Sequence, residues 1–210
     1  MKTGDLIKLG RYAGEEIVWK AIAEENGKFL LLSEKVLEYR PFHPLPVPKE
    51  LYGKDYMETN WGNCELRRWL NGEFLSCAFT EDERNHIPVS DVLYPTFYKT
   101  LHSRYPGERT CQDRIFLLTQ GQARLYLSEA DQIARLTDHA LAQANTIAVN
   151  PLKMYGAWWL RTTIGQGFDG SCLYVYNSVF GEKLYAMISS MGADFTARDI
   201  GVRPAVWYQE

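Results

Sequence analysis

The histidines are the first side chains to test for chemistry, because imidazole serves both as a metal ligand and as a general base. The chain has four of them, spaced far apart: His43, His86, His102 and His139. They form no H-E-x-x-H or H-x-H pattern, so the sequence gives no support to a metal-dependent hydrolase. No G-x-S-x-G elbow occurs either. We expect no catalytic residue, and a hydrolase stays open as an alternative because a Ser-His-Asp triad is set by geometry.

The cysteines show neither a zinc nor a redox pattern. The chain has four, and no two of them form a C-x-x-C pair: Cys64, Cys77, Cys111 and Cys172. We expect buried free thiols that act as small hydrophobic side chains. An oxidase that holds copper would need paired late thiols, and Cys172 stands alone in the last third. We therefore expect no metal and no cofactor.

The last third carries the side chains that best suit recognition. Aromatic, amide and charged residues stand there between strand-forming segments, and such residues on loops held by strands are typical of binding surfaces. The candidate ligand-binding residues are Phe168, Asp169, Tyr176, Asn177, Phe180, Asp194, Phe195 and Arg198. A calcium site would draw on Asp169, Asp194 or Asp199, but the Glu-Pro-Asn and Trp-Asn-Asp tripeptides common in lectin-type sites are absent. We expect these carboxylates to be solvated or to cap turns.

Two tryptophans and an arginine are close neighbours in the segment Trp158-Trp159-Leu160-Arg161. Alternation along a strand would put Trp158 and Leu160 on one face and Trp159 and Arg161 on the other. One tryptophan should then lie in the core, and only the other could touch solvent. We expect Arg161 and Arg203 to anchor carboxylates or loop carbonyls, because a planar guanidinium suits that structural role.

Composition limits the classes of protein and partner. The 210 residues are 46% apolar and 23% charged, which is typical of one globular domain over residues 1–210. A net charge of -3 leaves no basic excess, so nucleic acid is not an expected partner. The longest aliphatic run, Phe29-Leu30-Leu31-Leu32, is too short to span a membrane. The first ten residues have no signal-peptide apolar region, so we expect a cytoplasmic protein, with non-classical export or a phage particle as other options.

The first half should combine strands with a helix. Strands are expected over residues 6–9, 16–23 and 28–33, with Asn26-Gly27 as a type I′ turn. Prolines make 39–48 an extended surface loop. The helix should span 64–79, with Asn60 or Asn63 as N-cap, and the capping box 80–83 starts a short second helix. An irregular insertion is expected at about 90–112.

The second half should return from helices to strands. Thr119 is expected to cap a helix over 120–126, and 128–131 should start another over 132–136. Strands are predicted at 114–118, 158–161, 173–176, 183–187 and 202–207, with loops at 162–171, 177–181 and 189–201. Since both ends of the chain are β, they should share one sheet around a helical middle. The fold class is therefore α+β with a mixed or antiparallel sheet.

Five motifs follow one another along the chain. They are Thr59-Asn60-Trp61-Gly62-Asn63-Cys64-Glu65-Leu66-Arg67-Arg68-Trp69-Leu70-Asn71, then Ala78-Phe79-Thr80, Thr137-Asp138-His139-Ala140, Trp158-Trp159-Leu160-Arg161 and Gly201-Val202-Arg203-Pro204-Ala205-Val206. This ordered set resembles a large bacterial family catalogued as a domain of unknown function. The likeness extends from Gly10 to Trp207. The chain departs from the family at Thr162-Thr163-Ile164-Gly165, where Ser-Pro-Gly is common, and at His139, where tyrosine is usual.

The last third also resembles the C-type-lectin-like fold, in the version shared by formylglycine-generating enzymes and phage receptor-binding variable proteins. The likeness rests on the Trp-rich strand, the looped hairpins and the closing Gly-Val-Arg-Pro strand. It implies that the last strand pairs with an early one and that the late loops bind ligands. We expect a non-enzymatic binding module of bacterial or phage origin that recognises a protein or a glycan. The alternatives are an enzyme, hydrolase or oxidase, with a hidden site, and a structural domain of a larger assembly.

Overall fold

The computed structural model describes residues 1–44, 60–97, 106–144, 154–164, 171–180, 183–192 and 200–210. Helices and mostly antiparallel sheets are mixed along the chain, so the fold class is α+β. None of the helices in these ranges is long and apolar enough to cross a membrane.

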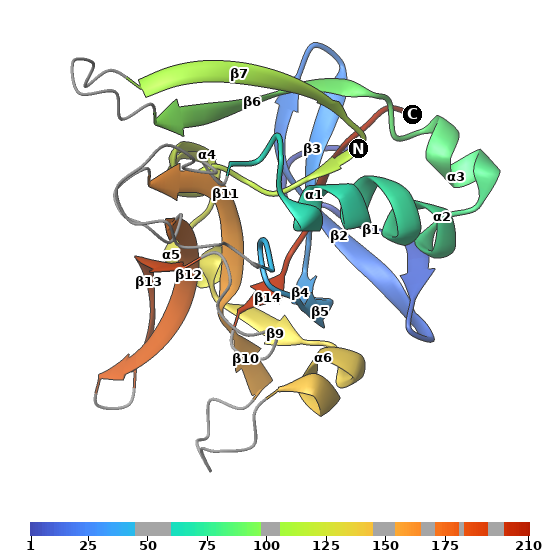
Figure 1. Ribbon diagram of the computed structural model, residues 1–210. Coiled ribbons are helices and arrows are strands. Elements are labelled where there is room, and N and C mark those ends of the chain that lie inside the picture. The colour runs from blue at the N-terminus through green and yellow to red at the C-terminus, as the bar shows by residue number, and fades with distance from the viewer. Residues whose placement is uncertain (45–59, 98–105, 145–153, 165–170, 181–182, 193–199) are drawn as a thin grey trace.

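The two ends of the chain meet in one sheet, which we call the terminal sheet. Its strand order is β1-β2-β3-β15-β8, and Figure 1 shows blue β3 beside the red C-terminal segment. The strands are β1 (Leu6–Tyr12), β2 (Glu15–Glu25), β3 (Lys28–Ser33), β15 (Ala205–Tyr208) and β8 (Ile115–Phe116). Ala205 lies opposite Leu32 in the antiparallel pair of β15 and β3. The expected pairing of the terminal strand with the N-terminal hairpin is confirmed.

The tight turn between β2 and β3 follows directly from its sequence. Asn26 and Gly27 have φ angles of 51° and 72°, as a type I′ turn requires of both central residues. This turn sets the register in which Glu25 lies opposite Lys28.

A second five-stranded sheet, the late sheet, holds the Trp-rich strand. Its order is β13-β12-β11-β14-β5. The strands are β13 (Lys183–Gly192), β12 (Ser171–Phe180), β11 (Trp158–Ile164), β14 (Gly201–Val202) and β5 (Glu38–Tyr39). β11 and β14 run parallel, and the other neighbours are antiparallel. A small sheet, ordered β10-β9-β4, consists of β10 (Tyr155–Gly156), β9 (Ala134–Leu136) and β4 (Lys35–Val36).

The helical middle starts with one continuous segment. It consists of α1 (Glu65–Trp69), the π-helical turn η1 (Leu70–Phe74) and α2 (Leu75–Ala78). Its N-cap is Cys64, whose Sγ accepts from the Arg67 N–H at 3.4 Å. The expected caps are wrong, because Asn63 Oδ1 is bonded to the Asn60 N–H at 2.8 Å in the preceding turn.

The remaining helices are short, and most begin at predicted caps. Their bounds are α3 (Glu81–Asn85), α4 (Gln120–Tyr126), α5 (Glu129–Gln132) and α6 (Asp138–Gln143). Thr80 and Thr119 form the predicted capping boxes of α3 and α4. The helix expected over 132–136 is wrong: Ala134 and Leu136 are buried while Arg135 is exposed, an alternation that suits strand β9.

The stretch expected as an irregular insertion at 90–112 forms a two-stranded antiparallel ribbon. It consists of β6 (Ser90–Phe97) and β7 (Pro106–Asp113). Val92 and Tyr94 are buried while Leu93 is exposed, so an alternating face packs on the core. Pro95 is tolerated because a ribbon needs no continuous ladder on both sides. The segment 39–48 was expected to be a surface loop, and this is wrong for its described residues, 39–44. Tyr39 and Phe42 in that part are buried.

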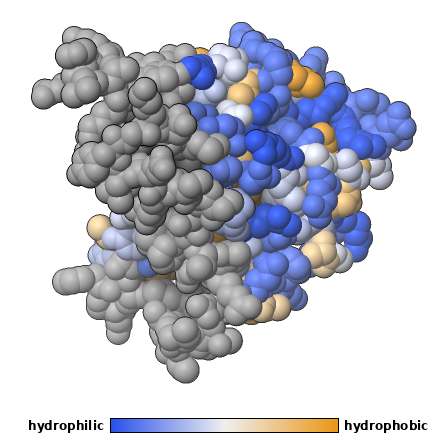
Figure 2. Space-filling model, viewed as in Figure 1, coloured by the Kyte–Doolittle hydropathy of each residue, from blue (hydrophilic) through white to orange (hydrophobic). Residues whose placement is uncertain are grey.

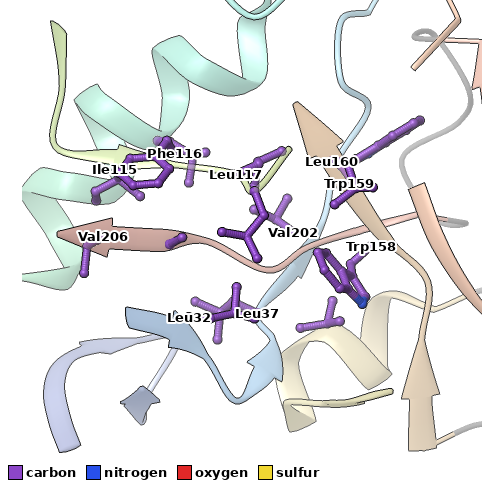
Figure 3. Close-up of a cluster of buried hydrophobic side chains, with 14 of the residues drawn as sticks. Leu32, Leu37, Ile115, Phe116, Leu117, Trp158, Trp159, Leu160, Val202 and Val206 are labelled. Carbon is purple, nitrogen blue, oxygen red and sulfur yellow. The ribbon is translucent and has the colours of Figure 1, made fainter. Parts of the chain in front are cut away.

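Both tryptophans of the Trp-rich strand are fully buried, so the expectation that one could reach solvent is wrong. Figure 3 shows Trp158 and Trp159 on β11 with Leu160, in the same cluster of buried side chains as Leu117 and Val202. Trp158 Nε1 donates to the Gln132 carbonyl at 2.9 Å, and Trp159 Nε1 donates to the Arg40 carbonyl at 2.8 Å. The late sheet is therefore covered on both faces at this point.

The buried arginines anchor backbone carbonyls, as predicted. Arg161 Nε donates to the Leu93 carbonyl at 2.9 Å and ties β11 to the ribbon. Arg203 Nε donates to the Ser33 carbonyl at 2.8 Å. Burial lowers the pKa of Arg161 to about 9 and that of Arg203 to about 10. Both guanidiniums therefore hold separate elements together in the interior.

Gly10 on β1 should tolerate no side chain. Its φ is +78°, and a Cβ there would lie 2.7 Å from the Ala78 carbonyl oxygen and from the Phe79 ring. Gly14 provides a matched control, because its φ is +88° but a Cβ would meet nothing within 4 Å. We expect Gly14→Ala to cost about 1 kcal/mol from the backbone alone and Gly10→Ala about 2 kcal/mol more from the steric clash. Urea unfolding measures both, and equal losses would contradict the predicted contact.

Candidate functional site

An aromatic row runs across one face of the late sheet, from a buried end to an exposed end. We define it as Trp159, Tyr174, Tyr176 and Met187. The register places Trp159 opposite Tyr174 and Tyr176 opposite Met187. Ring centroids are 6.2 Å apart for Trp159 and Tyr174, and 5.8 Å apart for Tyr174 and Tyr176. Because alternate residues of a strand share one face, these side chains form one continuous strip.

Exposure increases along this aromatic row. Trp159 is fully buried, Tyr174 and Tyr176 are half-buried, and Met187 is 49% exposed. The Tyr176 hydroxyl donates to Met187 Sδ at 3.3 Å. The buried end contacts Phe42, with ring centroids 5.8 Å apart. The row thus presents tyrosine and methionine side chains at the surface on strands that are fixed to the core.

Asn177 lies on the opposite face from Tyr176. Both residues belong to β12, which extends to Phe180, so the loop expected at 177–181 begins later. Asn177 Nδ2 donates to the Gly156 carbonyl at 3.2 Å, while its buried Oδ1 has no hydrogen-bond partner. Strand alternation therefore places these two candidate ligand-binding residues on opposite faces of the late sheet.

For the other predicted recognition residues, the structure does not describe the side chains. Phe180 is the last residue of β12, and its side chain lies outside the description. Five more lie outside the described residues: Phe168, Asp169, Asp194, Phe195 and Arg198. The same holds for Asp199 of the calcium alternative. Within the described ranges, no three His, Cys, Asp or Glu side chains gather in a way that could hold a metal ion.

A buried glutamate organises a second site, which we call the Glu38 cluster and define as Tyr12, Glu38, Arg40 and His139. Glu38 is 5% exposed and accepts hydrogen bonds from the Tyr12 hydroxyl and, at 2.7 Å, from Arg40 Nε. His139 Nε2 lies 3.8 Å from the same carboxylate. β5 supplies Glu38, β1 supplies Tyr12, and α6, capped by Thr137, supplies His139.

The Glu38 cluster raises the pKa of its tyrosine. Burial, and then the hydrogen bond to Glu38, raise the pKa of Tyr12 well above its usual value. The hydroxyl therefore remains a donor at neutral pH. The exposed Cys77 is near enough for the charge of Glu38 to act on it, and burial together with Glu73 and Glu38 raises the pKa of this thiol. A thiol with a raised pKa is a poor nucleophile.

The four cysteines form no disulfide bonds, as predicted, but only two of them are buried. Cys64 and Cys172 lie in the core, Cys77 is exposed, and Cys111 is intermediate. Burial raises the pKa of Cys64 to about 12 and that of Cys172 well above its usual value. These two thiols are therefore protonated core side chains at neutral pH.

The fold and these two sites define an α+β protein with an aromatic strip on one sheet and a buried polar cluster beside it. Residues 26–210 match the family described as Domain of unknown function (DUF6273). The chain belongs to this family. No curated protein and no solved structure matches the chain. The resemblance to an uncharacterised domain family is confirmed, and the lectin-like resemblance stays a prediction.

Proposed function

We propose that the chain is a non-enzymatic binding module that recognises a protein or a glycan through the β12–β13 hairpin and the loops of the last third. The aromatic row carries this proposal. Its outer members, Tyr176 and Met187, are accessible side chains held directly opposite each other on paired strands. Tyrosine supplies a large contact area and a polar hydroxyl, and methionine adapts to irregular partners.

The anchoring of the aromatic row makes it suitable for recognition. Trp159 is fixed by its hydrogen bond to the Arg40 carbonyl, and Tyr174 packs between Trp159 and Tyr176. The outer side chains therefore lose little conformational freedom when a ligand binds. Preorganisation of this kind increases affinity, because less ordering is required at the moment of association.

A C-type-lectin-like arrangement is the finer form of this proposal. It is supported by the antiparallel pair of the terminal strand β15 with the early strand β3. It is also supported by the position of β12 and β13, which lie at the far end of the late sheet from β5. A bacterial or phage origin and a phage-like receptor-binding role belong to the same proposal and rest on the resemblance of the sequence alone.

The proposal predicts that the exposed end of the aromatic row controls binding. Screening of the full chain against immobilised glycan and peptide libraries should yield a ligand. Tyr176→Ala and Met187→Ala should each weaken its binding about tenfold or more, because aromatic and methionine anchors contribute a large share of the energy at interfaces. Biolayer interferometry measures the affinity.

Leu125→Ala is the matched control for this experiment. Leu125 is a large apolar side chain on α4 that is 73% exposed, outside both the aromatic row and the Glu38 cluster. This variant should bind like the wild type. Thermal unfolding should show that Tyr176→Ala remains folded. Undiminished binding by both row variants would contradict the proposed surface, and a library screen without any ligand would contradict the binding function.

An enzyme is the second candidate function, and one observation favours it. His139 lies beside the Glu38 carboxylate, with Tyr12 on the same group. The pair resembles the base and orienting acid of a hydrolase in residue type. However, Glu38 already accepts from Tyr12 and Arg40, and the nearby Cys77 has a raised pKa. These contacts argue against an acid–base role for the Glu38 cluster.

A structural domain of a larger assembly is supported less well. Such a domain would be expected to expose a large apolar patch. The described surface in Figure 2 is mostly hydrophilic, with separate hydrophobic spots. Exposed large apolar side chains also occur on different elements, among them Leu6 on β1, Leu93 on β6, Leu125 on α4 and Met187 on β13.

A further inference from the structure

A cavity of about 450 Å³ lies beside the Glu38 cluster. Its lining comes from the chain just after β5 and from the long helical segment. Pro41, Pro44 and Leu66 make part of the wall apolar, and Arg40, Trp69 and Glu73 supply polar groups. This volume is in the range of small-molecule sites, which combine apolar walls with a few polar groups.

Trp69 differs from the other buried tryptophans in its hydrogen bonding. Its side chain lines the cavity and is only 8% exposed, yet its buried Nε1 has no hydrogen-bond partner. By contrast, Trp19 donates to the Leu9 carbonyl and Trp61 to Asp113, each at 2.8 Å. A buried donor left unsatisfied costs about 1–3 kcal/mol. An acceptor atom supplied by a ligand would remove that cost.

Arg40 supplies a cation next to this indole. Its guanidinium lies 4.3 Å above the Trp69 ring, and its Nε is held by Glu38. The hydrogen bonds of the described residues leave its terminal Nη groups without a partner. A guanidinium held in this way is suited to bind a carboxylate. Glu38, with Tyr12 and His139 behind it, therefore positions Arg40 rather than facing a ligand itself.

Most charges around the cavity are already paired. Arg68 and Glu65 also line it and form an ion pair with each other, and Arg40 is paired with Glu38 through Nε. Glu73 is the lining charge that makes no ion pair within the described part of the chain. Glu73 lies in the π-helical turn directly after Trp69, and such turns are frequent at functional sites. A ligand ammonium would complement Glu73, and a ligand carboxylate would occupy the Nη groups of Arg40 that Glu38 leaves open.

We propose that this cavity binds a free apolar α-amino acid. The ligand carboxylate lies against the Arg40 Nη groups and the Trp69 Nε1–H, and the ammonium faces Glu73. The apolar side chain packs against Pro41, Pro44 and Leu66. This site is separate from the aromatic row and does not depend on the proposed recognition of a protein or glycan.

Indole N–H resonances test the proposal directly. The full chain is labelled with ¹⁵N, and the Trp69 indole signal is assigned with Trp69→Phe. Addition of L-leucine to about 10 mM should move this signal saturably, because carboxylate binding gives Nε1 an acceptor. N-acetyl-leucine, without the ammonium, and leucine amide, without the carboxylate, should each bind at least about tenfold more weakly.

Variants separate the roles of the two charged groups. Arg40→Gln should abolish the response to leucine, while Arg124→Gln, a control on α4, should leave it unchanged. If Arg40→Gln does not fold, Glu73→Gln tests the proposal in its place. Glu73→Gln should weaken the binding of leucine and leave the binding of N-acetyl-leucine unchanged. A Trp69 signal that does not move with leucine would overturn the proposal. Equal binding of leucine and N-acetyl-leucine, or an unchanged response in Arg40→Gln, would also overturn it.

Discussion

Asp113→Ala is expected to lower the free energy of unfolding by about 3–5 kcal/mol, because it breaks a buried ion pair by removing one partner. Asp113 is 2% exposed and accepts from Trp61 Nε1 at 2.8 Å and from Arg67 Nε at 2.8 Å. Its Oδ1 also lies 2.8 Å from Arg67 Nη2. Alanine would leave a partly buried guanidinium and a buried indole N–H without their acceptor.

Asp91→Ala is the matched control, because Asp91 lies in the same two-stranded ribbon but is exposed. It accepts a hydrogen bond from the side chain of Gln112, and its loss should change stability by less than about 0.5 kcal/mol. Urea unfolding followed by tryptophan fluorescence measures both variants. Equal losses for Asp113 and Asp91 would refute the assigned role of the buried carboxylate.

Trp158→Ala should have an effect of similar size, about 3–5 kcal/mol, because it empties a large volume in the core. Trp158 is fully buried, donates to the Gln132 carbonyl, and lies 5.1 Å from the Arg203 guanidinium. The variant removes a hydrogen bond that joins α5 to the late sheet. It also exposes one side of Arg203 to a cavity, where a cation is costly.

Trp158→Phe separates the volume from the hydrogen bond. It keeps most of the aromatic packing and loses the N–H donor, so the cost should fall to about 1–2 kcal/mol. Calorimetric unfolding provides the comparison. A loss for Trp158→Phe as large as that for Trp158→Ala would show that packing around this ring contributes little.

Local signals in the sequence predict much of the fold. Asn26-Gly27 has the residues a type I′ turn needs, and Thr80 and Thr119 have the partner three residues later that closes a capping box. Each of these features is decided within four residues. The sheet that joins the two ends was predicted for a different reason, because both ends have a strand-like composition.

The elements that the sequence does not predict depend on distant contacts. The ribbon of β6 and β7 contains two prolines, Pro95 and Pro106, and its sequence looks irregular. In the fold, Arg161 from β11 donates to the Leu93 carbonyl of this ribbon. β9 resembles a helix after its start signal, but it pairs with β4 and β10. Such pairings are formed by residues far away in the sequence, and no local pattern contains them.

The candidate sites show the same difference between local sequence signals and contacts made by distant residues. Tyr176 is a candidate for recognition from its residue type alone, whereas its separation from Asn177 depends on where β12 ends. Glu38 gives no signal in the sequence, because a glutamate is normally exposed and only the fold buries it. Its partners, Tyr12 and His139, are supplied by distant elements of the chain.

The methyl group of Met187 offers the most direct test of the recognition surface. The chain has five methionines, and ¹³C-methyl labelling with Met187→Leu assigns this one. On addition of the ligand found in the library screen, the Met187 signal should shift in proportion to bound ligand, while that of Met1 stays unchanged. A stationary Met187 signal at saturation, with other resonances moving, would contradict recognition through the aromatic row.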